Sequence, residues 1–195
     1  MSIVQINFNH IYKKYYNYIL EDYNLEINND KINFIIGVNG SGKTTLIKCL
    51  FNLVNYHGEI KYNKDIKLIY IPEKVFLPDF IKMIDFIQIL TNKSKEEIVD
   101  YLLLFKIEQY IDFYLCNLSL GTKQKMLLIT GILQKADGYV FDEPLNGLDD
   151  KSIEVFNECL IKLKEDNKLI IIISHRLNNY PKIEKRIINI GNTND

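Results

Sequence analysis

The sequence has few of the residues that most often separate domains or cross-link a chain. It contains no tryptophan, four prolines and nine glycines among 195 residues, and no Pro- or Gly-rich stretch separates one part from another. The three cysteines, Cys49, Cys116 and Cys159, are odd in number and widely spaced, with no CxxC pair and no zinc-ligand spacing. We therefore expect a single domain over residues 1–195, with its thiols reduced.

An excess of charge of either sign is also missing. The chain has 24 basic and 25 acidic residues and a net charge of −1, so no overall positive field favours a nucleic-acid partner. The longest aliphatic run, Leu169–Ile173, is far shorter than the ~20 residues that cross a bilayer. The first ten residues lack the basic start and apolar run of a signal peptide. We expect a cytoplasmic protein that reaches a membrane only through a partner.

The sequence does contain an alternation of short apolar strands and amphipathic helices. Residues 3–8 and 20–27 alternate between apolar and polar side chains, which predicts two half-exposed strands. Further strands are predicted at 32–36, 67–71, 138–141, 169–173 and 186–190, and helices at 43–53 and 151–164. Such alternation is typical of an α/β fold, in which helices cover the faces of a parallel sheet.

Residues 74–118 differ from this alternation and predict a small helical subdomain. Apolar side chains recur at intervals of three and four, at Phe80, Ile84, Ile87 and Leu90. Ser94 and Glu97 have the spacing of a capping box before a second helix over residues 98–105.

A phosphate-binding loop is predicted where the strand at 32–36 ends. Residues 37–44 match GxxxxGK[ST] without gaps, between a buried strand and a helix. Glycines let the backbone curl so that its N–H groups face a phosphate, and the helix N-terminus adds positive charge. The predicted phosphate contacts are Gly37, Val38, Asn39, Gly40, Ser41, Gly42, Lys43, Thr44 and Thr45, with Lys43 reaching the β- and γ-phosphates and the Thr44 hydroxyl directed to Mg²⁺.

Two adjacent acids follow the strand at 138–141. Buried carboxylates need partners, and a metal ion and a nucleophilic water would supply them. Asp142 is suited to Mg²⁺, and Glu143 to orient or polarise the water that attacks the γ-phosphate. The alternative is that both acids only cap the next helix. His175 follows the strand at 169–173, at the edge where α/β sheets bind ligands, although a histidine there is more often structural.

With these motifs in place, the chain resembles the ATP-binding cassette (ABC) ATPases. Residues 118–125 resemble the family's signature motif, residues 143–149 its segment from the catalytic glutamate into the D-loop, and residues 174–176 its switch-histidine segment. The resemblance covers residues 15–175. It implies a P-loop fold with a mostly parallel sheet, an antiparallel N-terminal part and an inserted helical subdomain, and it implies MgATP hydrolysis.

The resemblance also implies roles for single residues. Tyr15 would stack on adenine, with Tyr16 as a rival within Lys14–Asn17. Ser119 and the Gly121 backbone would close on the γ-phosphate held by a second ABC subunit, and Asp149 would couple the two sites. His175 would contact that phosphate and the attacking water, beside Glu143 and Lys43 as catalytic groups.

Two segments depart from the usual family pattern. The signature has Leu120–Thr122 in place of a Gly-Gly-Gln run, but it keeps Gly121. Ile71-Pro72-Glu73 stands where many members carry glutamine, and it resembles the variant found in ABC-2-type exporter ATPases. Glu73 would lie near Mg²⁺.

The resemblance leads us to expect the motor subunit of an exporter, peripheral on the inner face of the cell membrane and bound to a separate integral membrane permease. The short segment after the last strand also favours export. One alternative is a soluble ABC ATPase in translation or DNA repair, although its usual second ATPase domain or coiled coil is not found. Another is a binding module without catalysis.

Overall fold

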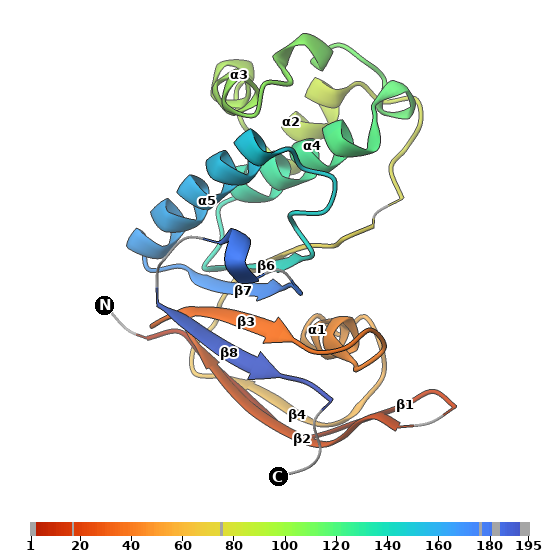
Figure 1. Ribbon diagram of the computed structural model, residues 1–195, viewed down its shortest axis with the longest axis vertical. Coiled ribbons are helices and arrows are strands. Elements are labelled where there is room, and N and C mark those ends of the chain that lie inside the picture. Colours follow the sequence, from red (N-terminus) through yellow and green to blue (C-terminus); the bar gives the residue numbers. More distant parts are fainter. Residues whose placement is uncertain (1–2, 17, 75, 176, 181–183, 192–195) are drawn as a thin grey trace.

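The computed structural model describes residues 3–16, 18–74, 76–175, 177–180 and 184–191. Figure 1 shows two stacked sheets with helix α1 between them, and helices α2 to α5 on the far side of the larger sheet. The helices are α1 (Lys43–Leu50), α2 (Met83–Thr91), α3 (Lys95–Leu104), α4 (Leu120–Leu133) and α5 (Asp150–Glu165).

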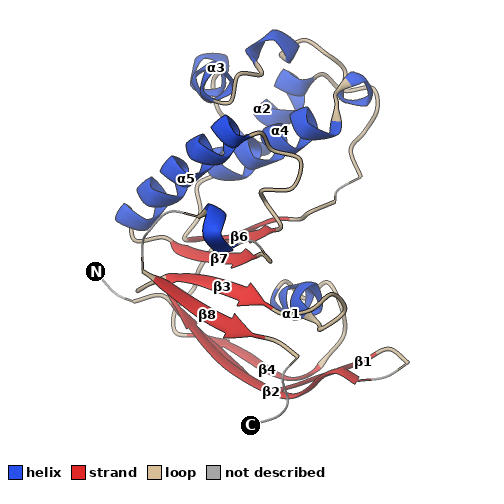
Figure 2. Cartoon of the chain, in the orientation of Figure 1, coloured by secondary structure: helices blue, strands red, loops and turns tan. Residues whose placement is uncertain are grey.

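The larger sheet is parallel, with the strand order β5-β6-β7-β3-β8. Its strands are β5 (Leu68–Ile71), β6 (Gly138–Asp142), β7 (Leu169–Ile173), β3 (Ile32–Ile36) and β8 (Lys185–Asn189). The smaller sheet is antiparallel, with the order β2-β1-β4, and consists of β1 (Gln5–Lys14), β2 (Tyr18–Asn28) and β4 (His57–Tyr62). The expected mostly parallel sheet with an antiparallel N-terminal part is confirmed (Figure 2).

The parallel sheet separates two hydrophobic cores because its side chains alternate between the two faces. In β7, Leu169, Ile171 and Ile173 belong to the core that also holds α1 and the antiparallel sheet. Ile170 and Ile172 belong to the core under helices α2 to α5. All five are fully buried, which explains why this strand is an unbroken aliphatic run.

Most predicted elements are present, with some different ends. The strands predicted at 32–36 and 169–173 coincide with β3 and β7. The helix predicted over residues 43–53 ends three residues early, because Asn52 adopts a left-handed conformation (φ 53°) and Leu53 is exposed. Strand β4 was not predicted, since Ile60 is its only residue that is not exposed and its sequence shows no apolar alternation.

The region 74–118 contains the two expected helices. The capping box is confirmed: the Ser94 hydroxyl accepts from the Glu97 backbone N–H at 3.2 Å, and the Glu97 carboxylate accepts from the Ser94 N–H at 3.1 Å. The placement of Phe80 in the first helix was wrong, because α2 starts at Met83 and Phe80 is 91% exposed. Helix α4 packs against this region and against β5. The family resemblance implied a helix N-terminus at Ser119 and Gly121, but the extent of the helix was not predicted.

The carboxyl ends of β3, β5, β6 and β7 lie along one edge of the parallel sheet. The loop after β3, Glu73 after β5, Asp142 and Glu143 at the end of β6, and His175 after β7 therefore come to the same edge. This is where open α/β sheets bind ligands. No helix within the described ranges combines the length and the apolar character that a bilayer crossing requires.

Candidate active site

The loop between β3 and α1 has the backbone of a phosphate cradle. Gly40 and Gly42 have φ values of 84° and 100°, in a region that side chains strongly disfavour. A Cβ atom on Gly42 would come within 2.8 Å of the Ile19 side chain. Gly42 precedes Lys43, the first residue of α1, and no side chain of a described residue caps this helix. Its first N–H groups therefore face the loop, where an anion would be stabilised.

The ammonium group of Lys43 lies over this loop. Its Nζ atom donates to the carbonyl oxygens of Gly37 and Val38, at 2.8 and 2.9 Å. The residue is 9% exposed, so its charge is held inside the loop rather than in solvent. A fixed positive charge among converging N–H groups suits a polyphosphate.

Asp142 is connected to the same helix. Its Oδ2 atom accepts a hydrogen bond from the Thr44 hydroxyl at 3.1 Å and another from the Tyr70 hydroxyl at 3.1 Å. The residue is 4% exposed, and burial raises the pKa of its carboxyl, while the two hydrogen bonds oppose that shift. Burial and the nearby Asp142 charge raise the pKa of Tyr70, so its hydroxyl stays protonated and donates.

Glu143 has a strained backbone, with a φ of 48°. Its N–H donates to the Ile173 carbonyl at 2.9 Å, which ties the turn after β6 to the end of β7. The Nδ1 atom of His175 lies 2.9 Å from Glu143 Oε1, and the Glu143 side chain is 15% exposed. A non-glycine residue held in this conformation is frequent at sites where one side chain must be aimed.

Residues of the phosphate loop line a common cavity of about 240 Å³ together with the acids that follow β5 and β6. Its lining includes Ile19, Asn39, Gly40, Gly42, Lys43, Thr44, Thr45, Glu73, Asp142 and Glu143. Glu73 Oε1 accepts a hydrogen bond from Asn146 Nδ2 at 3.3 Å, so the segment after β5 touches the segment after β6. His175 opens instead onto an adjoining cavity of about 350 Å³, together with Gly37 and Val38.

The residues fit MgATP. The loop offers backbone N–H groups and one ammonium group to the phosphates, while Thr44 and Asp142 offer hard oxygen donors. No group of three or more His, Cys, Asp or Glu side chains among the described residues has the arrangement of a metal site. Mg²⁺ is usually held by one or two protein oxygens together with substrate phosphates and water.

Ser119, Gly121 and Asp149 form a second group, away from that cavity. Ser119 caps α4 by accepting from the Thr122 N–H at 3.1 Å, and it is exposed. A Cβ atom on Gly121 would come within 2.8 Å of the carbonyl oxygen of Gly147, whose own φ is 77°. The start of α4 therefore packs closely on the segment between β6 and α5.

Asp149 caps α5 through its contacts with Ser152, whose N–H and hydroxyl donate to Asp149 Oδ1 at 2.9 and 3.0 Å. Its other oxygen pairs with the Lys125 ammonium at 2.6 Å. The Lys125 hydrogen bond, followed by the Ser152 N–H, holds the pKa of Asp149 well below its ordinary value. Asp149 thus connects α4 to α5 within one chain.

Tyr15 lies apart from both groups. It is 53% exposed, and the Lys13 ammonium lies 4.7 Å from its ring centroid. Tyr16 is 98% exposed. Neither tyrosine lines the phosphate-loop cavity, whereas Ile19 does. Asn17 and Arg176, which belong to the predicted segments, lie outside the described residues.

Sequence reasoning missed three contacts of the site. Tyr70 donates a hydrogen bond to the carboxylate of Asp142, and Lys125 donates one to the carboxylate of Asp149. Asn146 donates a hydrogen bond to Glu73. The position of Tyr70, three residues before Glu73 in a predicted strand, was the one available signal for the first of these.

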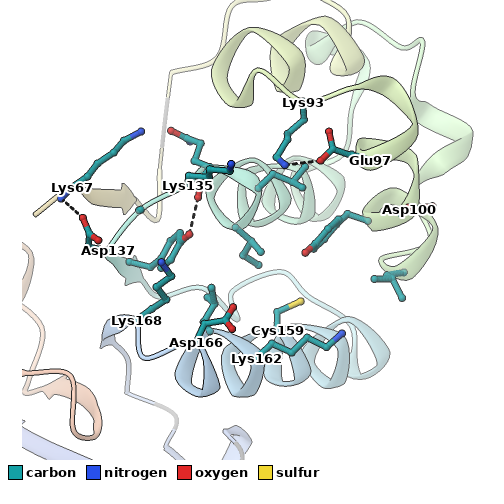
Figure 3. A pocket seen from close by; sticks show the side chains of 18 residues that line it. Lys67, Lys93, Glu97, Asp100, Lys135, Asp137, Cys159, Lys162, Asp166 and Lys168 are labelled. Carbon is teal, nitrogen blue, oxygen red and sulfur yellow. Dashed lines mark hydrogen bonds and ion pairs between the residues drawn. The ribbon is translucent and has the colours of Figure 1, made fainter. Parts of the chain in front are cut away.

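A larger cavity lies at another edge of the sheet, within the part of the chain that the structure describes. It measures about 780 Å³ and lies between α3, the end of α4, the start of β6 and α5 (Figure 3). Lys67 and Asp137, which line it, lie at the amino ends of β5 and β6. Because this is the edge opposite the phosphate loop, cavity size alone would point to the wrong place.

Comparisons with known proteins agree with this geometry. The profile of the family described as "ABC transporter" matches residues 20–146. The chain is 30% identical over 178 residues to "Uncharacterized ABC transporter ATP-binding protein MJ1023" of Methanocaldococcus jannaschii, covering 87% of this chain and 67% of that protein. It is 31% identical to "Zinc import ATP-binding protein ZnuC" of Mannheimia succiniciproducens, covering 81% of this chain and 61% of that protein.

The fold matches solved structures. The "Dimeric structure of a post-hydrolysis state of the ATP-binding cassette MJ0796 bound to ADP and Pi" superposes with a TM-score of 0.81 over 95% of this chain and 94% of the other, at 22% identity. At that identity the likeness establishes the fold. Together with the family match, it places the chain in the ABC transporter family, among its ATP-hydrolysing ATP-binding cassettes.

Proposed function

We propose that the chain is the ATPase subunit of an ABC exporter, acting with a second cassette and a membrane permease. The observation that carries the proposal is the meeting of Lys43, Thr44, Asp142 and Glu143 around one cavity, with His175 hydrogen-bonded to Glu143. A cleft of this composition suits phosphoryl transfer to water.

Each group has a distinct task in the proposed reaction. The loop N–H groups and Lys43 bind the β- and γ-phosphates. Glu143 orients the attacking water and accepts its proton. The water oxygen bonds to the γ-phosphorus as the bond from that phosphorus to the bridging oxygen breaks, and ADP leaves. His175, which already contacts Glu143, holds that carboxylate in place and touches the γ-phosphate.

Mg²⁺ would be held by Thr44 and Asp142, with Glu73 nearby, and it would neutralise charge on the phosphates. Asp142 is buried and Thr44 is hydrogen-bonded to it, so both oxygens are fixed in advance. Glu73 reaches the same cavity, and its bond to Asn146 links it to the segment that follows Glu143.

The second cassette completes the site. Ser119 and Gly121 lie at an exposed helix N-terminus that is not part of the chain's own cavity, so we propose that they close on the γ-phosphate bound by a partner subunit. Asp149 would couple the two nucleotide sites across the interface between the subunits. The solved relative described as dimeric supports this arrangement.

An exposed aromatic patch offers a surface for the permease. It consists of Phe76, Phe80, Phe113 and Tyr114, which are 103%, 91%, 46% and 47% exposed. The segments before and after α2 and α3 run side by side here, since Lys82 bridges to Tyr114. The patch begins three residues after Glu73, so a permease helix seated here would respond to the nucleotide site. In this proposal the chain lies on the inner face of the cell membrane, bound to its permease.

For the direction of transport we propose export. The Pro72-Glu73 pair, which stands where many members of the family carry glutamine and resembles the exporter variant, supports export. The relative ZnuC is named for zinc import, so a flux assay with reconstituted permease distinguishes the two directions.

The test of catalysis is Glu143→Gln. Because the amide cannot accept the water proton, hydrolysis should fall by about 10²–10⁴-fold while ATP is still bound. The matched control is Glu154→Gln, an exposed glutamate on α5, which should hydrolyse ATP at the wild-type rate. Wild-type turnover by the Glu143→Gln variant would contradict the assignment.

The same variant tests the transporter assignment. Tagged Glu143→Gln, held with MgATP, should recover an integral membrane protein from detergent-solubilised cells, identified by mass spectrometry. Recovery of ribosomal or DNA-repair proteins without a membrane protein would replace the transporter with a soluble ABC ATPase.

A further inference from the structure

The carboxylate of Asp142 is held by two donors on the same oxygen. Thr44 and Tyr70 each donate to Oδ2 at 3.1 Å, and no described residue donates to Oδ1. The first donor belongs to the proposed metal shell. The second is outside that shell and has no part in the reaction described above.

The strand register explains how Tyr70 reaches this oxygen. Tyr70 pairs with Val140 in the parallel ladder between β5 and β6, and Asp142 lies two residues further along β6. Residues two apart point to the same face of a sheet, so Tyr70, Val140 and Asp142 all face α1. The long phenol side chain then reaches along that face to the carboxylate.

The ring of Tyr70 is itself held in place. It stacks on Phe51 with a centroid distance of 5.3 Å and an interplanar angle of 24°. Phe51 directly follows the last turn of α1, while Thr44 lies in its first turn. The two donors to Asp142 are therefore fixed by opposite ends of the same helix.

The chemistry of the donor suits a metal site crowded with acids. Glu73, Asp142 and Glu143 line one small cavity, and a neutral hydroxyl orients Asp142 without cancelling its charge. A lysine at the same place would compete with the metal. The Thr44 hydroxyl must serve both the metal and Asp142, whereas the Tyr70 hydroxyl serves Asp142 alone among the described residues.

We propose that Tyr70 is a positioning residue for the magnesium site, holding Oδ2 of Asp142 so that Oδ1 is presented to the ion or to its water. This inference rests on the proposed function. Hydrogen-bond partners of metal-site groups typically change metal affinity by about 10–100-fold when they are removed.

The test is Tyr70→Phe, which removes one oxygen and keeps the stacked ring. We expect the affinity for Mn²⁺, measured by electron paramagnetic resonance with a non-hydrolysable ATP analogue bound, to fall by about tenfold. The affinity for a fluorescent ATP analogue in EDTA should not change. In hydrolysis, the Mg²⁺ concentration at half-maximal rate should rise more than the maximal rate falls.

Tyr62→Phe is the matched control, because the Tyr62 hydroxyl donates to the carbonyl of Leu50 at 3.1 Å, near the same helix but away from Asp142. A second variant, Phe51→Leu, keeps the Tyr70 hydroxyl but removes the ring that holds it. It should weaken Mn²⁺ binding in the same direction by a smaller factor.

Unchanged Mn²⁺ affinity in Tyr70→Phe, with wild-type binding intact, overturns the positioning role and leaves the ATPase proposal standing. A wild-type protein that binds no ATP analogue overturns both.

Discussion

At the scale of single residues, Asp149 shows how one side chain can serve two elements. It caps α5 and pairs with Lys125 of α4, whose side chain is only 11% exposed. Its pKa is lowered, so its contribution to stability is present above the pKa of an unfolded aspartate, about 3.9, and is lost as pH falls toward the lower folded value.

Asp149→Ser tests this contribution. Serine keeps an N-cap oxygen but loses the charge, so the free energy of unfolding should drop by about 1 kcal/mol near neutral pH. Urea unfolding should be measured at about pH 7 and at stepwise lower pH. The difference in the free energy of unfolding between variant and wild type should become smaller below about pH 4. A difference that stays constant through this range would mean that the ion pair contributes nothing.

At the scale of elements, the contact between α4 and β5 depends on a missing side chain. A Cβ atom on Gly131 would come within 2.4 Å of Ile71 Cγ1 and 2.8 Å of its Cδ1. Ile71 is 4% exposed and cannot move into solvent. The glycine therefore lets the helix lie close to the strand that leads to Glu73.

Gly131→Ala has two effects on the free energy of unfolding, and they are opposite in sign. Alanine favours a helix interior over glycine by about 0.5–1 kcal/mol, while overpacking a core costs about 1–3 kcal/mol. We expect a net loss of about 1 kcal/mol in chemical unfolding. In an Ile71→Ala background, which removes both clashing atoms, the same substitution should cost nothing or stabilise. Equal costs in both backgrounds would place the strain elsewhere.

The elements that sequence analysis predicted correctly are those with strong local signals. Residues 169–173 are aliphatic throughout and form β7, and the glycines before Lys43 identify the loop. Strand β4 carries no such signal because it is mostly exposed. Tyr70 was missed for a different reason: its partner Asp142 is 72 residues away, and only the register of β5 against β6 brings the two together.

At the scale of the whole molecule, the proposed site and the proposed permease surface share a short stretch of chain. Tyr70, Glu73 and Phe76 lie within seven residues. Strand β5 is fixed to β6, while the aromatic patch is exposed beyond it. In the proposed arrangement, a permease bound at the patch would therefore contact the chain only a few residues away from Glu73, which lines the cavity.

The double substitution Phe76→Ser and Phe80→Ser tests the surface. Both side chains are more than 90% exposed, so the fold and ATP binding should be kept. Recovery of the membrane partner in the pull-down should fall sharply. The control is Ile89→Ser, because Ile89 is also exposed and apolar (72%) but lies on α2, outside the patch. This variant should leave recovery unchanged. Equal recovery by both variants and wild type would move the interface away from the patch.

The glycines that shape the site also limit its chemical lifetime. Gly40 and Gly147 each follow an asparagine, Asn39 and Asn146. A following glycine, having no Cβ atom, leaves its nitrogen free to attack the asparagine amide, and asparagine is among the thermally labile residues. The product is a carboxylate, which at position 39 would repel the phosphates that the loop is built to bind. During storage of the purified protein, ATP binding should therefore be lost while the hydrophobic core stays folded.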